Sequence, residues 1–250
     1  MRIVRFGRGS WGILDEGVRA TRGPGGPPTG RVHRLDEVRL LPPAAPTKIV
    51  CVGRKYRGHV REMGHDLSGE AGLFLKAPNA LAAPGAEIPY PEFTRLLHYE
   101  GELAVVIGRR MRNVPRGEAL RHVLGYTCAL DLTVRDVQAT DLQWVRAKSA
   151  DGFLPLGPWI VTDLDPQGLL LRTYVNGELR QDGRTADMIF PVAEILAHVR
   201  SFMTLAAGDV VLTGTPEGVG EIRPGDDVEV AVDGIGSLRT RIVGHGASLG

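Results

Sequence analysis

The chain has 250 residues, of which 43% are hydrophobic and 24% are charged, so it can bury a full globular core and is not expected to be disordered. Its 30 basic and 29 acidic residues leave a formal net charge of +1, which argues against bulk attraction to nucleic acid or to an anionic membrane surface. We therefore expect the partner to be a small molecule.

The two cysteines, Cys51 and Cys128, are far apart in the sequence and each lies in an apolar stretch. They make neither a disulfide framework nor a zinc-binding spacing, so we expect buried free thiols. The first ten residues lack a signal-peptide apolar region, and no apolar run reaches the ~20 residues that span a bilayer. These features predict a cytoplasmic protein with no membrane segment.

The N-terminal part is predicted to be a small β-unit, with strands at residues 2–6 and 11–14 and a turn-rich stretch at residues 23–28. A proline cluster then precedes a strongly apolar strand at residues 48–52. We place a boundary near residue 46, which gives a small N-terminal β-domain (1–46) and a larger second domain (47–250).

Strands dominate the rest of the chain. We expect them at residues 73–76, 101–107, 125–132, 159–162, 169–175, 209–213, 227–232 and 237–243. Predicted helices lie at residues 56–63, 116–122, 133–144 and 192–203, of which the last has a clear apolar stripe. Because helices do not alternate regularly with strands, the pattern predicts a mostly β fold with a few helices (α+β), largely antiparallel.

Glu100 and Glu102 form the most informative pair of residues. Two positions apart on a strand, they emerge on the same side with Cα atoms about 6.5–7 Å apart. Next to a strand that enters the core, such a pair is costly unless a cation lies between the carboxylates or one is protonated. Asp131, flanked by apolar residues, offers a third carboxylate, and oxygen ligands of this kind suit Mg²⁺ or Mn²⁺. The alternative is that Glu100 and Glu102 form the solvated face of a half-exposed strand.

Three further segments carry groups with possible chemistry. Lys148 lies in what we expect to be an irregular loop, where it could bind a substrate carboxylate or simply be solvated. His59 and Glu62, spaced i, i+3 on a predicted helix, could form a general base or a surface ion pair. The glycine-rich residues 213–220 could cradle an anion with backbone N–H groups or form a tight turn, and they do not match a Walker A loop.

Taken together and in order, these segments resemble the fumarylacetoacetate hydrolase family, and in particular its bacterial 2-hydroxyhepta-2,4-diene-1,7-dioate isomerase-like members. The resemblance extends from about Lys48 to Val243. It is carried by the motifs KIVCVGRKY (48–56), GHVREMG (58–64), FLKAP (74–78), YEGELA (99–104), GYT (125–127), DLTVRDVQ (131–138), KS (148–149), DGF (151–153) and TGTPEGVG (213–220).

This resemblance implies a β-roll catalytic domain, a homodimer, and one Mg²⁺ or Mn²⁺ ion held by Glu100, Glu102 and Asp131. His59 and Glu62 correspond to an acid–base pair, and Lys148 to a catalytic lysine beside the metal. The resemblance places the remaining candidates near the substrate, namely Arg54, Tyr56, Arg135, Gln138, Gly214 and Thr215. Lys55 departs from the family, because many members carry asparagine there, which leaves the exact substrate open.

The resemblance therefore implies an enzyme for small enolisable 2-oxo or 2-hydroxy-dienoic dicarboxylates, most readily an isomerase or decarboxylase in aromatic-acid degradation. Hydrolysis of acylpyruvates and decarboxylation of oxaloacetate are the alternatives, since the same site would serve them. A non-catalytic β scaffold with a structural cation is the alternative from a different class. An acid–base pair beside the carboxylates argues against it, because a structural cation site needs none.

Overall fold

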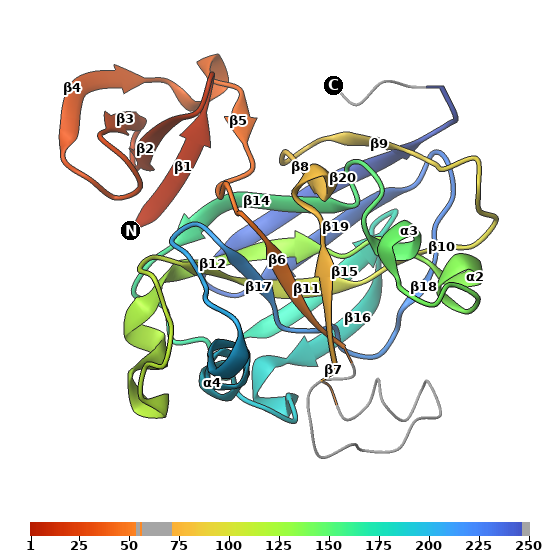
Figure 1. The fold of residues 1–250 in the computed structure, drawn as a ribbon. Helices are drawn as coiled ribbons and strands as arrows, with labels where there is room; N and C mark the ends of the chain where they lie inside the picture. Colours follow the sequence, from red (N-terminus) through yellow and green to blue (C-terminus); the bar gives the residue numbers. More distant parts are fainter. Residues whose placement is uncertain (54–55, 57–71, 247–250) are drawn as a thin grey trace.

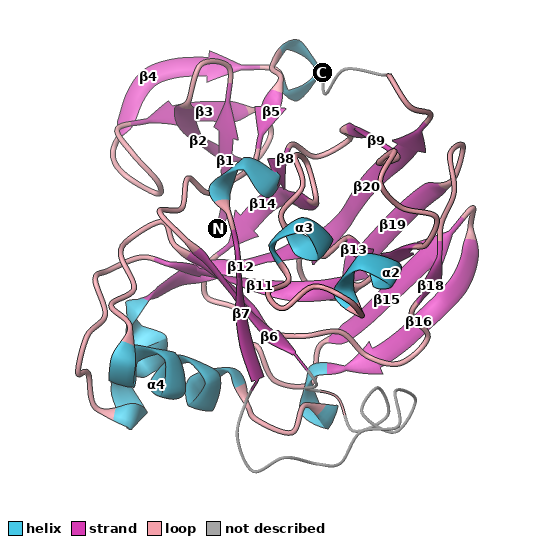
Figure 2. Ribbon diagram, turned by 45° about the vertical axis from the view of Figure 1, so that its right-hand side comes forward, coloured by secondary structure: helices cyan, strands magenta, loops and turns pink. Residues whose placement is uncertain are grey.

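The computed structural model describes residues 1–53, 56 and 72–246. In this part of the chain the strands form three sheets, and helices are short and few (Figures 1 and 2). The expected mostly β, α+β architecture is confirmed. The predicted helix at residues 56–63 lies outside the described residues, apart from Tyr56.

The largest sheet runs from the N-terminal hairpins to the centre of the molecule in the order β4-β3-β2-β1-β14-β12-β11-β17-β6-β7, with β5 beside β1 and β8 beside β14. Its strands are β1 (Arg2–Phe6), β2 (Ser10–Leu14), β3 (Val18–Thr21), β4 (Pro28–His33), β5 (Leu40–Leu41), β6 (Ile49–Gly53), β7 (Gly72–Lys76), β8 (Leu81–Ala82), β11 (Gly101–Ile107), β12 (Val123–Leu130), β14 (Leu154–Val161) and β17 (Val210–Leu212).

Two smaller sheets complete the fold. One has the order β16-β15-β19-β20-β9, and the other has the order β13-β10-β18. Their strands are β9 (Glu87–Pro89), β10 (Leu97–Tyr99), β13 (Thr133–Val134), β15 (Leu170–Val175), β16 (Glu178–Arg184), β18 (Gly220–Glu221), β19 (Asp227–Val232) and β20 (Gly236–Val243). The helices are α2 (Arg135–Gln138), α3 (Val145–Lys148) and α4 (Val192–Phe202), with 3₁₀ turns η1 (Leu35–Glu37), η2 (Pro78–Ala80), η3 (Arg116–His122) and η4 (Thr185–Asp187).

The N-terminal strands have a small core of their own, formed by Val4, Phe6, Leu14, Val18 and Ala20. Strand β1 nevertheless pairs with β14, so the hairpins continue the large sheet. They stand at one end of the molecule, coloured red in Figure 1. The predicted domain boundary near residue 46 stays a prediction.

Several sequence-based assignments needed correction. The helix predicted at residues 133–144 is wrong over most of its length, because Thr133 and Val134 pair with β10 and only α2 is helical within this range; α3 begins after it, at Val145. Strands β4 and β16 were missed because their sequences are mostly polar and their residues mostly exposed, and β3 was missed because it has only four residues. Helix α4 ends one residue earlier than predicted, and residues 116–122 form a 3₁₀ rather than an α-helix.

Candidate metal centre and active-site cavity

Strand register brings the three predicted carboxylates together. Strands β11 and β12 are antiparallel, with Gly101 opposite Leu130, so Glu100 just before one strand faces Asp131 just after the other. The Asp131 N–H donates to the Glu100 carbonyl at 2.8 Å, which closes this end of the ladder. Strand β11 is buried along its full length, with β12 and β17 on either side in its own sheet and β15 and β19 of the neighbouring sheet packed against it. The buried strand therefore carries Glu100 and Glu102 into the interior.

The carboxylates of Glu100, Glu102 and Asp131 are all buried, and one oxygen of each lies within 4.8 Å of the others. The reading of Glu100 and Glu102 as a solvated strand face is therefore wrong. Burial, with the negative charges of Asp131 and Glu100, raises the pKa of Glu102 well above its usual range. Crowding three carboxylates away from water is unfavourable unless positive charge compensates them.

Two buried lysines supply part of that charge. The Nζ of Lys148 donates to Oε2 of Glu100 and to Oδ2 of Asp131, both at 2.7 Å, while the Nζ of Lys76 donates to the other oxygen of Asp131 and to the Leu132 carbonyl. Burial alone would lower the pKa of Lys148, but Asp131 and Glu100 outweigh it and raise that pKa. Burial dominates for Lys76 and lowers its pKa.

Helix α2 supplies a further cation. Arg135 begins this helix directly after β13, which places its side chain beside the triad. Its guanidinium forms an ion pair with Oε1 of Glu100. A second guanidinium nitrogen donates to Oε1 of Gln138 at 2.9 Å, one helical turn further on. Both side chains line the cavity described below, and their predicted contact with the substrate stays a prediction.

The glycine-rich segment after β17 lies against Glu102. Strand β17 pairs with β11, so the chain leaves the sheet beside the carboxylates, and the Gly214 N–H donates to Oε2 of Glu102. The Thr215 hydroxyl donates to the Gly101 carbonyl at 2.8 Å and accepts from Nε2 of Gln181 at 2.7 Å. The single hydroxyl proton of Thr215 is therefore already donated to a backbone carbonyl of the protein.

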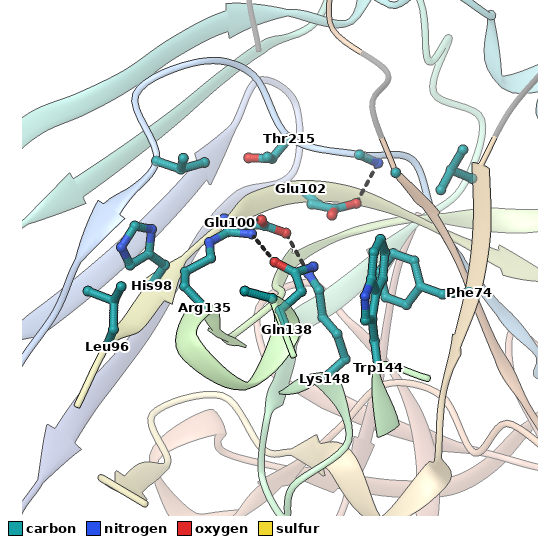
Figure 3. Close-up of a pocket in the computed structure, with 15 residues that line it drawn as sticks. Phe74, Leu96, His98, Glu100, Glu102, Arg135, Gln138, Trp144, Lys148 and Thr215 are labelled. Carbon is teal, nitrogen blue, oxygen red and sulfur yellow. Dashed lines mark hydrogen bonds and ion pairs between the residues drawn. The ribbon is translucent and has the colours of Figure 1, made fainter. Parts of the chain in front are cut away.

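A cavity of about 540 Å³ opens over these groups. Figure 3 shows Glu100, Glu102, Arg135 and Lys148 at its centre, with Phe74 and Trp144 along one wall. The two aromatic rings meet edge to face with centroids 5.4 Å apart, and the Lys148 ammonium lies 4.9 Å from the Phe74 ring centroid. The rest of the lining is formed by Val52, Gly53, Leu96, His98, Gln138, Ala139, Gly214, Thr215 and Val219. The cavity thus has a charged floor and a largely apolar wall.

The remaining predicted site residues divide into two groups. Tyr56 is buried, and its hydroxyl has no hydrogen-bond partner among the described residues. Burial, then the nearby charge of Glu102, raises its pKa. Arg54, His59 and Glu62 lie outside the described residues.

Sequence reasoning misjudged Lys148 and overlooked two other residues. Lys148 ends the short helix α3 and is only 2% exposed, so the expectation of a lysine in an irregular loop is wrong. Lys76 and Gln181 were not singled out at all, although Lys76 donates to Asp131 and Gln181 accepts from the Gly101 N–H between the two glutamates. The signal for Lys76 was its place in a strand of otherwise apolar residues.

The donor set fits a small divalent cation. Around Mg²⁺ at ~2.1 Å, neighbouring ligands of an octahedron are about 3 Å apart and opposite ones about 4.2 Å. Carboxylate oxygens within 4.8 Å of one another need only a small contraction to reach these spacings. Glu100, Glu102 and Asp131 could therefore hold one such ion, with open positions toward the cavity.

Comparison with known proteins agrees with this architecture. The family model described as the C-terminal domain of fumarylacetoacetate (FAA) hydrolase matches residues 48–243, and one described as Rv2993c-like, N-terminal, matches residues 1–43. In the described part of the chain, no helix has the length and apolar character needed to cross a membrane.

Individual relatives are similar over most of their length. A solved 2-hydroxyhepta-2,4-diene-1,7-dioate isomerase from Mycobacterium marinum superposes with a TM-score of 0.90 at 40% identity, covering 99% of this chain and 100% of that one. A 5-carboxymethyl-2-hydroxymuconate delta-isomerase from Mycobacterium smegmatis gives 0.90 at 42% identity, with the same coverage. The mitochondrial oxaloacetate tautomerase FAHD1 of Pongo abelii is 44% identical, covering 78% of this chain and 90% of that protein. This chain therefore belongs to the fumarylacetoacetate hydrolase family.

Proposed function

We propose that this protein is a Mg²⁺- or Mn²⁺-dependent enzyme that moves a proton between the keto and enol forms of small 2-oxo or 2-hydroxy-dienoic dicarboxylates. The observation that carries the proposal is the buried triad of Glu100, Glu102 and Asp131, of which Glu100 and Glu102 line the cavity. Three relatives support this choice of reaction, because the two isomerases and the tautomerase are all named for rearrangements of this kind.

The charges around the cavity favour a substrate with two carboxylates. Among the described residues, the three carboxylates are matched by the cations of Lys76, Lys148 and Arg135. A divalent cation bound at the triad would act as a Lewis acid on the 2-oxo group and would add two positive charges. The loaded site would then attract a dianion.

The chain's own groups would stabilise the enolate and move the proton. The Lys148 ammonium lies at the cavity floor, where it can donate to the oxygen that gains negative charge, and a preorganised donor of this kind is typically worth about 3–4 kcal/mol of barrier. Arg135, held by Glu100 and Gln138, is oriented to bind a carboxylate. The Phe74–Trp144 wall would exclude water from the carbon skeleton. His59 and Glu62 are proposed as the proton-transfer pair on the resemblance alone.

The test uses protein stripped of metal by a chelator, with Mg²⁺ or Mn²⁺ added back. Keto–enol exchange of oxaloacetate, isomerisation of an unsaturated 2-hydroxy diacid, acylpyruvate cleavage and decarboxylation are each followed by ultraviolet absorbance. We expect the two proton-transfer reactions to depend on metal and to be lost in Glu102→Gln, while Glu229→Gln, on the partly exposed Arg239 ion pair, stays active.

Each other outcome would change the assignment. Faster acylpyruvate cleavage or decarboxylation would replace tautomerisation as the reaction of the same site. Tight Mn²⁺ binding with no turnover of any of these substrates would favour the non-catalytic scaffold. The homodimer and the cytoplasmic location stay predictions.

A further inference from the structure

We infer that Gln181, on β16, is a positioning residue that locks the metal-ligand strand and the glycine-rich segment into one unit. The inference rests on the proposed function in that Glu100 and Glu102 are taken as metal ligands. Gln181 itself lies outside the cavity lining and would touch neither metal nor substrate. Its effect would pass through Gly101, Thr215 and Pro216.

The side-chain amide of Gln181 uses each of its polar atoms on this junction. Its Oε1 accepts from the Gly101 N–H at 3.0 Å, and its Nε2 donates to the Thr215 hydroxyl at 2.7 Å and to the Pro216 carbonyl at 2.9 Å. Gln181 is fully buried, so water cannot replace these bonds. One side chain thus ties together three segments that are far apart in the sequence.

These hydrogen bonds hold the backbone at the position that orients the two glutamate ligands. Gly101 lies between Glu100 and Glu102, so a shift of its peptide would move both carboxylates. The Thr215 hydroxyl bonds the Gly101 carbonyl, and the adjacent Gly214 N–H bonds Glu102, which closes a ring of hydrogen bonds around the ligand strand. The orientation of the amide is fixed, because exchanging its oxygen and nitrogen would set like groups against each other.

The backbone of the segment after β17 lies so close to β16 that side chains would not fit between them at two glycines. A Cβ on Gly218 would lie 2.1 Å from the Arg180 carbonyl oxygen, and a Cβ on Gly183 would lie 2.5 Å from Cβ of Pro216. The segment after β17 is therefore seated directly on β16. Gln181 supplies the polar contacts at the centre of this seat.

The test measures the affinity for Mn²⁺ alone, by the electron paramagnetic resonance signal of the free ion. Gln181→Met keeps the length of the side chain and removes all three hydrogen bonds. We expect its dissociation constant for Mn²⁺ to rise about tenfold or more, as is typical when a group that orients metal ligands is removed. Val199→Ala, in the buried face of α4, is the control, because it destabilises the fold without touching the site.

A purely structural role would lower the melting temperature of both variants and leave both affinities equal to that of the wild type, which would overturn the inference. If Gln181→Met does not fold, Thr215→Val opens the same ring at Thr215, because it removes the hydroxyl's bonds to Gln181 and to the Gly101 carbonyl. A raised dissociation constant in that variant supports the inference, and an unchanged one refutes it. Failure of the wild type to bind Mn²⁺ would instead remove the metal site, and the inference with it.

Discussion

Glu102→Gln gives the sharpest test of the triad, because its effect on stability should change sign with metal. Glu102 is buried beside two other carboxylates, and this raises its pKa above the ordinary value of 4.5. A carboxyl group whose pKa is raised by folding costs stability as the pH rises above its unfolded value, at about 1.4 kcal/mol for each unit of the shift. Glutamine removes this cost and can still accept from the Gly214 N–H.

In chelator at pH 7, we therefore expect Glu102→Gln to be at least as stable as the wild type. Its advantage should disappear as the pH is lowered toward about 4.5, where the unfolded carboxyl group also becomes protonated. With Mn²⁺ at 100 times its dissociation constant, the wild type gains about 2.7 kcal/mol. For a chain of 250 residues this corresponds to a rise of about 5–10 °C in melting temperature, which the variant should largely lose.

Thermal unfolding in chelator and in Mn²⁺, at several pH values, measures both effects. Glu229→Gln serves as the control because its carboxylate is partly exposed and far from the triad in the sequence. In chelator, the melting temperature of Glu102→Gln should equal or exceed that of the wild type. In Mn²⁺, the wild type should have the higher melting temperature. A variant that is less stable without metal, yet gains as much from Mn²⁺ as the wild type, would show that Glu102 is not a crowded metal ligand.

Three further predictions follow from the same contacts. Lys148→Met should lower kcat by about 10²–10³-fold without weakening Mn²⁺ binding; a parallel loss of Mn²⁺ affinity would instead mark Lys148 as part of the ion's binding site. Asp131→Asn removes the anion shared by Lys148 and Lys76 and should cost about 3–5 kcal/mol in urea unfolding, so a loss below ~1 kcal/mol would contradict the observed pairing. Gly101→Ala places a Cβ 2.0 Å from Oγ1 of Thr173 and should lower the free energy of unfolding by at least the ~1–3 kcal/mol of ordinary overpacking. Adding Thr173→Ala should restore part of this stability, and no recovery would mean that the contact with Thr173 is not the cause.

The sequence by itself determined the elements whose pattern is local. Strand β11 was predicted with its observed bounds, because its apolar run is long and continuous, and β19 likewise, because its side chains alternate between core and solvent. The pairing of Glu100 with Glu102 followed from the period of a strand, and their cost in a buried position followed from electrostatics. These local rules pointed to a carboxylate site but left a solvated strand face as the alternative, and the resemblance to the family favoured the site.

Only the tertiary structure decided which distant groups join that site. The Gly101–Leu130 register places Asp131 opposite Glu100, and no sequence pattern reveals a register between separate strands. Lys76 and Lys148 are buried because Asp131 accepts from both of them, a condition that neither segment shows alone. Gln181 comes from a strand too polar to be predicted, yet it contacts Gly101 and Thr215 across two sheets. Burial and long-range hydrogen bonding are properties of the packed sheets, so they could be read only once the sheets were in place.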